Sequence, residues 1–218
     1  MKFKIVFFDC DGVLLFGNPL GRLGEASNLP QTIYRKWAQN YYDRKITFDE
    51  WNKNIESSYK KAKLNKKKYD AIIDFKHYEI NKEAKDLNHY LKEKRYEMAI
   101  ISSGSQEYVS QVANYFGIKR YRINTIMDFD DSGLFIRLKT FGEDPDVKVM
   151  QINEICEMLN VAPRETIFIG DSDNDLKAFE YTKHGILYRT SDPRIEKIAW
   201  KKVDDLREVI KILEDAEL

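Results

Sequence analysis

Four short apolar runs interrupt the chain, and each gives way abruptly to polar residues. They are Phe3–Phe8, Glu97–Ile101, Thr166–Ile169 and Gly185–Tyr188. Short apolar runs bounded by turn-forming residues are typical of strands that are buried on both faces of a parallel sheet. We therefore predict that these runs form parallel strands in the centre of the fold.

Helical spacing of apolar residues fills most of the intervals between these runs. The predicted helices span Asn81–Arg95, a stretch through Val109, Val112 and Phe116, Val147–Leu159, a stretch through Leu176 and Phe179, and Asp204–Leu213. Residues 122–140 predict a hairpin that turns at residues 130–133. Strands that alternate with helices predict an α/β fold: a Rossmann-like, three-layer core around a mostly parallel sheet.

The long interval between the first two strands has a different pattern. From Pro30 to Ile80, apolar residues follow helical spacing, around Trp37 and again around Ile55, with no convincing strand. We predict a small helical cap at residues 16–80, inserted after the first strand. The core domain would then consist of residues 1–15 and 81–218.

The stretch that leads into this insertion predicts a loop. Residues 13–29 contain Gly17, Gly21 and Gly24 among mixed polar and apolar residues, which favours a flexible connection. Asn28 is then a candidate N-cap for a helix with Pro30 in its first turn.

The net charge and the cysteines indicate which partners and which cellular compartment to expect. The 36 basic and 36 acidic residues leave no net charge, so no global field would attract nucleic acid or a membrane surface. Cys10 and Cys156 lie in separate apolar segments, as buried free thiols of a reducing compartment do. The N-terminal apolar run is too short for a secretory signal. We expect a cytoplasmic protein.

Two carboxylates follow the first predicted strand. Asp9 and Asp11, two residues apart at a strand end, can face the same side, and Gly12 permits a turn beside them. Crowded carboxylates repel each other, and a cation or a shared proton relieves the repulsion. An acidic loop with a turn glycine is the simpler interpretation of this cluster alone.

Hydroxyl groups follow the second predicted strand. Ser102 and Ser103 precede Gly104 and a helix start, where backbone N–H groups and the helix dipole favour a phosphate. Ordinary N-capping by serine is the simpler interpretation of this pattern in isolation.

The segment after the third predicted strand is the most acidic of those that follow the four predicted strands. Asp171, Asp173 and Asp175 follow within five residues, and such oxygen ligands suit a hard cation. Lys148 lies in the first turn of the preceding predicted helix, where a lysine is most often solvated. Its position between the other clusters makes it a candidate site residue.

Taken in order, these elements resemble the four motifs of the haloacid dehalogenase superfamily. The motif positions are filled by Asp9, Asp11 and Gly12 (DxDG), Ser102 (a strand ending in Ser or Thr), Lys148, and Gly170, Asp171, Asn174 and Asp175 (GDxxND). The helical insertion, the hairpin and the Lys148–Asp171 spacing are most similar to the phosphoserine-phosphatase-like branch. The cap does not repeat the acidic and arginine residues with which phosphoserine phosphatases hold serine, so the substrate stays open.

The resemblance implies a Mg²⁺-dependent phosphatase that acts on small phosphorylated metabolites. Asp9 would attack phosphorus and form an aspartyl-phosphate, and Asp11 would serve as general acid and then base. Mg²⁺ would bind Asp9, the Asp11 carbonyl group and Asp171. The phosphate would bind Ser102, Ser103, Lys148 and Gly12, with backbone N–H groups of Gly12 and Ser103 as extra donors. Asn174 and Asp175 would support the site.

Two other functions are compatible with these residues. A phosphoglucomutase-like phosphotransferase shares every core residue and differs in whether water or a sugar hydroxyl accepts the phosphoryl group. A non-catalytic phosphate-binding module should have lost a catalytic position, and none is missing. The basic run Lys60–Lys68 predicts a solvated helical face or, as a lesser possibility, a surface that steers polyanions. The oligomeric state is open.

Overall fold

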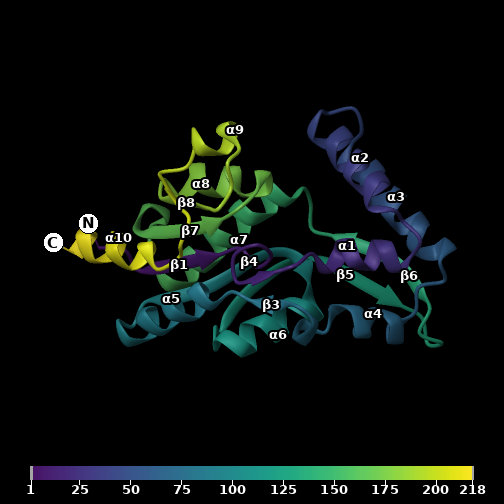
Figure 1. Cartoon of the computed structure of the whole chain (residues 1–218), viewed down its shortest axis with the longest axis horizontal. Coiled ribbons are helices and arrows are strands. Elements are labelled where there is room, and N and C mark those ends of the chain that lie inside the picture. The colour runs from purple at the N-terminus through teal and green to yellow at the C-terminus, as the bar shows by residue number, and fades with distance from the viewer. Residues whose placement is uncertain (1, 218) are drawn as a thin grey trace.

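The computed structural model describes residues 2–217, and its core is one seven-stranded sheet between two helical layers (Figure 1). The strand order is β6-β5-β4-β1-β7-β8-β9, and only β6 runs antiparallel to its neighbour. The strands are β1 (Ile5–Phe8), β4 (Glu97–Ser105), β5 (Arg120–Phe129), β6 (Phe135–Thr140), β7 (Thr166–Gly170), β8 (Gly185–Tyr188) and β9 (Lys201–Val203). The predicted α/β class and the mostly parallel sheet are confirmed.

Strand β1 is apolar throughout because both of its faces are covered. Val6 and Phe8 belong to one hydrophobic core, and Ile5 and Phe7 belong to the other. Adjacent strand residues point to opposite faces, so a strand buried on both sides needs an unbroken apolar run. Each core is large enough to hold one layer of helices against the sheet.

The helices divide between these two faces. The first layer contains α5 (Lys82–Glu93), α6 (Gln106–Phe116) and α10 (Glu208–Glu217). The second contains α7 (Asp144–Leu159), α8 (Leu176–Thr182) and the short α9 (Pro193–Glu196). Cys10 and Cys156 are buried free thiols in different cores, so the sheet separates them, as their sequence contexts suggested.

The segment between β2 and β3 contains four α-helices: α1 (Pro19–Ala26), α2 (Gln31–Tyr42), α3 (Phe48–Lys61) and α4 (Lys66–Ile73). A short antiparallel ribbon of β2 (Leu15–Phe16) and β3 (Glu79–Ile80) joins the two ends of this segment. In Figure 1, α2 and α3 rise from the sheet at the end opposite to α10. The segment is therefore cap-like, as predicted, although the strand β3 within it was not expected.

The prediction of a flexible connection at residues 13–29 is wrong. Eight of these residues form α1, which Asn18 caps by accepting a hydrogen bond from the Gly21 N–H at 2.7 Å. Pro19 occupies the first turn, where its missing N–H has no cost. Asn28 does not cap α2: it adopts a left-handed backbone with φ 59°, and Pro30 precedes the helix without a side-chain cap.

The hairpin of β5 and β6 packs against the helical segment. Phe135 lies 5.5 Å from the Tyr59 ring, and the Leu138 N–H donates to Glu56 of α3 at 3.1 Å. The turn between α3 and α4 also bonds to the hairpin tip, where the Lys66 N–H donates to the Gly133 carbonyl at 2.8 Å. These contacts cover the outer edge of β6, which would otherwise be an exposed strand edge.

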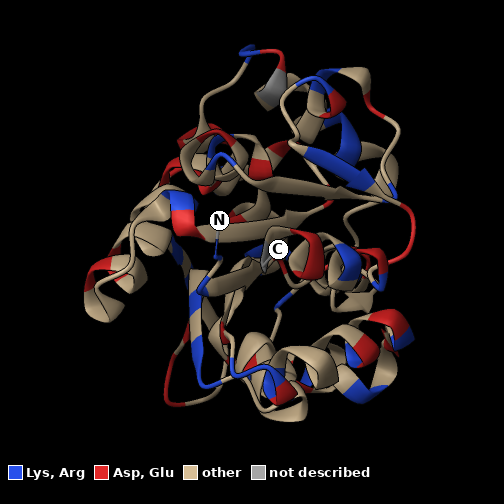
Figure 2. Cartoon of the chain, turned by 90° about the vertical axis from the view of Figure 1, so that its left-hand side faces the viewer, with Lys and Arg blue, Asp and Glu red and all other residues tan. Residues whose placement is uncertain are grey.

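The basic run Lys60–Lys68 does not form one helical face. It spans the end of α3, a turn and the start of α4, and Leu64 in its middle is buried. Lys60 pairs with Glu56 at 2.5 Å and Lys66 pairs with Asp70, each one helical turn away. Figure 2 shows basic and acidic residues interspersed over the face that it presents, in keeping with the neutral net charge. Within residues 2–217, no helix is both long and apolar enough to span a membrane.

Replacing Gly185 with alanine should destabilise the protein. An added methyl group at this start of β8 would overlap the buried Phe179 ring, so we expect a loss of about 1–3 kcal/mol in the free energy of unfolding. Gly24→Ala within α1 is the matched control. Its methyl group would lie 3.5 Å from Leu29, and it should raise stability by about 0.5–1 kcal/mol. Denaturant unfolding measures both, and equal midpoints for wild type and Gly185→Ala would contradict this packing.

Candidate active site

Three adjacent strands bring the predicted site residues to one edge of the sheet. Phe8 of β1 pairs with Ile100 of β4 and with Ile169 of β7, so the residues that follow these three strands are neighbours. The Asp9 N–H extends this ladder by donating to the Ile169 carbonyl at 2.9 Å. The carboxyl ends of parallel strands are where sites form in such sheets.

Carboxylate groups from two of these strand ends converge. Asp9, Asp171 and Asp175 each offer an oxygen, and the three oxygens lie within 4.8 Å of one another. Asp9 and Asp175 are buried, and Asp171 is half-buried. Gly12 permits this approach, because its backbone has φ 79° and an added Cβ would overlap the Asp171 carboxylate.

Lys148 enters this cluster from α7. Its Nζ lies 2.6 Å from Asp175 Oδ1 and 3.2 Å from Asp9 Oδ1, and the side chain is only 2% exposed. The helix starts at Asp144, earlier than predicted, so Lys148 occupies the second turn and not the first. A lysine at this position is thus fully engaged with carboxylates and not solvated.

Asp175 organises the loop after β7. Its Oδ2 accepts the backbone N–H groups of Asp171 and Ser172 at 2.9 and 3.1 Å, while its Oδ1 accepts from Lys148. These three bonds use most of its acceptor capacity. Asp175 therefore fixes the loop and the lysine, and Asp9 and Asp171 have more capacity left for a ligand.

The serines lie within β4, not after it, because the strand continues to Ser105 through a register shift after Ser102. Ser102 Oγ accepts the Gly104 N–H at 3.0 Å and keeps its own proton to donate. Ser103 Oγ accepts from Asn174 Nδ2 at 3.1 Å, and Asn174 Oδ1 accepts from Lys148 at 3.2 Å. A chain of hydrogen bonds thus joins both sides of the site.

Asp11 has a partner that the sequence did not reveal. Tyr108 of α6 donates its hydroxyl proton to Asp11 Oδ1 at 2.7 Å, and its ring is buried. The Asp11 carboxylate lies outside the Asp9–Asp171–Asp175 group. In the sequence, Tyr108 follows the apolar spacing of its helix, which predicts a core residue. Only the tertiary structure shows that its hydroxyl group is part of the site.

One expected phosphate donor is engaged elsewhere. The Gly12 N–H donates to the Leu15 carbonyl at 2.9 Å, which closes the turn after β1. This N–H is therefore bonded within the chain, and its binding of phosphate stays a prediction. The close approach of Asp171 is the role that the geometry gives to Gly12.

Burial and like charge shift the pKa values of these carboxyl groups upward. Burial raises the pKa of Asp9 well above its ordinary value, and Asp175 and Asp171 add to this rise while Lys148 opposes it. Burial also raises the pKa of Asp11 to about 6, although Tyr108 and Lys148 lower it. For Asp171, burial and then the charge of Asp175 raise the pKa to about 7. Four carboxyl groups thus face a single ammonium group.

This charge imbalance fits a divalent cation. Converging carboxylate oxygens are the ligands that Mg²⁺ prefers, and a bound cation would relieve their repulsion. Asp9 and Asp171 are the residues that could hold it. Lys148 is well placed to keep its charge, since Asp175 and Asp9 raise its pKa far above the ordinary value despite burial.

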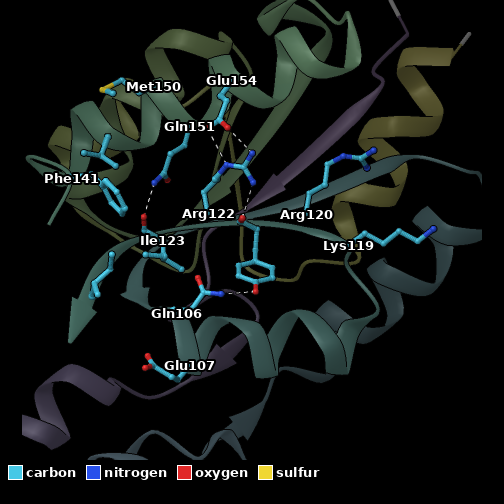
Figure 3. Close-up of a pocket in the computed structure, with 13 residues that line it drawn as sticks. Gln106, Glu107, Lys119, Arg120, Arg122, Ile123, Phe141, Met150, Gln151 and Glu154 are labelled. Carbon is cyan, nitrogen blue, oxygen red and sulfur yellow. Dashed lines mark hydrogen bonds and ion pairs between the residues drawn. The ribbon is translucent and has the colours of Figure 1, made fainter. Parts of the chain in front are cut away.

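One cavity adjoins the predicted phosphate-binding residues, and a second, larger one lies away from them. The first, of about 80 Å³, lies beneath the cap, and Ser103 forms part of its wall. The second, of about 930 Å³, follows β5 between α6 and α7 and includes none of the predicted catalytic or metal-binding residues (Figure 3). Along its strand edge, Arg122 and Gln151 donate to the carbonyl groups of Tyr121 and Ile123. Those acceptors are therefore already satisfied within the chain.

The fold is a Rossmann-like α/β core, and the carboxylates at its strand ends could hold a cation. A model of the haloacid dehalogenase-like hydrolases matches residues 3–181, and the chain belongs to this family. The sequence matches none of the curated proteins with which it was compared.

Solved phosphoserine phosphatases share this fold. A phospho-aspartyl intermediate analogue and a substrate-bound complex of phosphoserine phosphatase each have a TM-score of 0.82 at 20% identity, and each aligns with 98% of this chain. The alignment covers 100% and 99% of those two chains. A probable phosphoserine phosphatase from Vibrio cholerae has a TM-score of 0.77 at 16% identity over 98% of this chain and 64% of its own. At this level of identity the likeness shows a shared fold.

Without metal, the acidic cluster should make stability fall as pH rises. The folded state holds protons on Asp11 up to about pH 6 and on Asp171 up to about pH 7, whereas unfolded aspartates release theirs near 3.8. The folded state therefore binds more protons between about pH 4 and 7, and stability is lost across this window. Asp171→Asn should remove part of the loss, on the order of a few kcal/mol.

Thermal unfolding in EDTA across this pH range measures the effect as the difference between wild type and Asp171→Asn. Asp173→Asn is the matched control, because Asp173 faces Arg194 at the surface, outside the cluster. Added Mg²⁺ should stabilise the wild type and the control more than Asp171→Asn. Parallel pH curves for wild type and Asp171→Asn would contradict the charge imbalance.

Proposed function

We propose that the protein is a Mg²⁺-dependent phosphatase that hydrolyses small phosphate monoesters through an aspartyl-phosphate on Asp9. The observation that carries this proposal is the contact of buried Asp9 with Lys148, within the Asp9–Asp171–Asp175 cluster, at the strand ends of a haloacid dehalogenase-like hydrolase. Structurally similar phosphoserine phosphatases include one described as a phospho-aspartyl intermediate analogue, which supports the same chemistry here.

Asp9 is the nucleophile in this proposal. Its oxygen forms a bond to phosphorus while the bond to the leaving-group oxygen breaks. Mg²⁺ held by Asp9, the Asp11 carbonyl group and Asp171 would offset the repulsion between the anionic substrate and the carboxylates. Lys148 adds a fixed positive charge 3.2 Å from the nucleophile.

Asp11 is the general acid and then the general base. A carboxyl group with a pKa of about 6 can donate a proton to the leaving oxygen and later accept one from water near neutral pH. Ser102, Ser103 and Lys148 would bind the phosphoryl oxygens, and Asn174 and Asp175 would hold Ser103 and Lys148 in place.

Residues 16–80 act as the cap of this enzyme. The β2–β3 ribbon is the only strand pairing between its two ends in the described chain, and the hairpin of β5 and β6 packs beneath it. A small cavity under the cap favours small metabolites over phosphoproteins. The two buried free thiols suit a reducing compartment such as the cytoplasm.

Asp9→Asn should lower kcat by at least about 10³-fold, because the amide cannot act as the nucleophile. Purified wild type and variant are assayed with p-nitrophenyl phosphate and a panel of small phosphate monoesters, in Mg²⁺ and in EDTA. Wild-type turnover should need Mg²⁺. Thermal unfolding of the variant in Mg²⁺ establishes that it is folded.

Asp173→Asn is the matched control for this experiment as well, since it makes the same change at a half-buried carboxylate that pairs with Arg194 and lies outside the Asp9–Asp171–Asp175 cluster. It should keep kcat within a few-fold of the wild type. Normal turnover in folded Asp9→Asn would remove Asp9 as the nucleophile. Transfer of the phosphoryl group to a sugar hydroxyl in place of water would instead support the phosphotransferase alternative.

Tyr108→Phe should move the alkaline limb of the pH profile for kcat/KM to higher pH. The Tyr108 hydroxyl group stabilises ionised Asp11 and lowers its pKa, so the phenylalanine variant should keep Asp11 protonated at higher pH. An alkyl phosphate is the substrate for this test, because its leaving group needs the proton. An unchanged limb in the variant would show that Asp11 does not set it.

A further inference from the structure

The cavity under the cap has a lining of unusual chemistry. Five of its lining residues are aromatic, and they come from α2 and α3: Tyr34, Tyr41, Phe48, Trp51 and Tyr59. Their rings pack edge to face, with centroids of Tyr34 and Tyr41 at 5.7 and 5.5 Å from Trp51. Its volume of about 80 Å³ admits only a small group.

This cavity adjoins the phosphate-binding side of the active site. Ser103 belongs to its wall, and the hydrogen bonds from Ser103 through Asn174 to Lys148 lead to Asp9. The Thr125 hydroxyl group, also in the wall, donates to the Ser103 carbonyl at 2.8 Å. A phosphate bound by Ser103 and Lys148 would therefore lie next to this cavity, which its leaving group could occupy.

The charge of the lining is negative. Among the described residues that line the cavity, Asp144 is the one carboxylate and none is a lysine, arginine or histidine. Asp144 Oδ1 accepts a hydrogen bond from Asn124 Nδ2, which leaves its Oδ2 for a ligand. Glu143, the preceding residue, accepts a hydrogen bond from the Tyr41 hydroxyl group at 3.0 Å. The basic residues Arg44 and Lys45 line a separate, outer cleft of about 610 Å³ that shares Tyr41 and Phe48 with the cavity.

A cavity lined by aromatic rings and a carboxylate, with no basic side chain in its described lining, is suited to bind an ammonium group. Ring faces attract a desolvated cation, and the carboxylate adds a direct charge interaction. An anionic leaving group would meet Asp144 without a counter-charge in the wall. We infer that the leaving group carries an ammonium group, so that the substrate is a small amino-alcohol phosphate. This inference rests on the proposed phosphatase function.

Phosphocholine and its tert-butyl analogue, in which carbon replaces nitrogen, test the role of charge at constant shape. Wild-type enzyme in Mg²⁺ should hydrolyse phosphocholine with a kcat/KM at least about tenfold higher than that of the analogue. Asp144→Asn and, separately, Trp51→Leu should each reduce this preference several-fold. Asp146→Asn is the matched control: it lies one half-turn along α7, pairs with Lys177 at 2.6 Å and does not line the cavity, so the preference should persist.

Equal or reversed preference in the wild type would overturn the inference and assign the cavity to a neutral leaving group. A higher kcat/KM for phosphoserine or glycerol phosphate than for both phosphocholine and phosphoethanolamine would overturn it as well. Hydrolysis of p-nitrophenyl phosphate in the same preparation shows whether the proposed function itself holds.

If that ester is not hydrolysed either, calorimetric titration with choline and with its neutral tert-butyl analogue decides the chemistry of the cavity without catalysis. Choline that binds the wild type, and binds Asp144→Asn more weakly, supports the ammonium site. Equal binding of the two alcohols, or no binding of choline, overturns it.

Discussion

The contact between Lys148 and the carboxylates of Asp9 and Asp175 is the interaction on which the site depends. Lys148 is the only buried lysine or arginine among residues 2–217 with described side chains, and it contacts Asp9 and Asp175. Two further carboxyl groups, Asp171 and Asp11, lie close enough to raise the pKa of Asp9. One ammonium cannot neutralise that many acids, so the folded chain keeps some of them protonated or requires a divalent cation. The folded chain therefore has an excess of negative charge at the carboxylate cluster, where the proposed substrate would bind.

The sheet makes this arrangement possible by geometry alone. Parallel pairing of β1 with β4 and β7 delivers Asp9, Ser102 and Asp171 to one edge, while α7 supplies Lys148 from the layer above. The cost of burying the charges is offset by hydrogen bonds, most of them to Asp175, which fixes both the lysine and the β7 loop. Removing one partner would leave the others as uncompensated buried charges.

The local sequence predicted much of this core and the two cap helices around Trp37 and Ile55, but neither the first cap helix nor the docking of the cap. Apolar runs such as Phe3–Phe8 report burial on two faces, and the motif residues follow them directly, so strand ends and the acidic cluster could be predicted. The helix at Pro19–Ala26 was missed because Gly21 and Gly24 weaken helix propensity, whereas burial against the other helices of the cap compensates. The Tyr108–Asp11 bond and the docking of the hairpin join residues far apart in the chain, and no local pattern contains them.

Helix α7 links the two halves of the proposed function. Asp144 and Lys148 lie four residues apart, hence on the same side of the helix, and the charge of Asp144 contributes to the raised pKa of Lys148. Lys148 contacts Asp9, whereas Asp144 lines the aromatic cavity under the cap. In the proposed function the core residues carry the phosphoryl chemistry, and the aromatic wall belongs to the inserted helices. Selectivity can thus change with α2 and α3 while the chemistry stays with the sheet, and Asp144 is the point where the two meet.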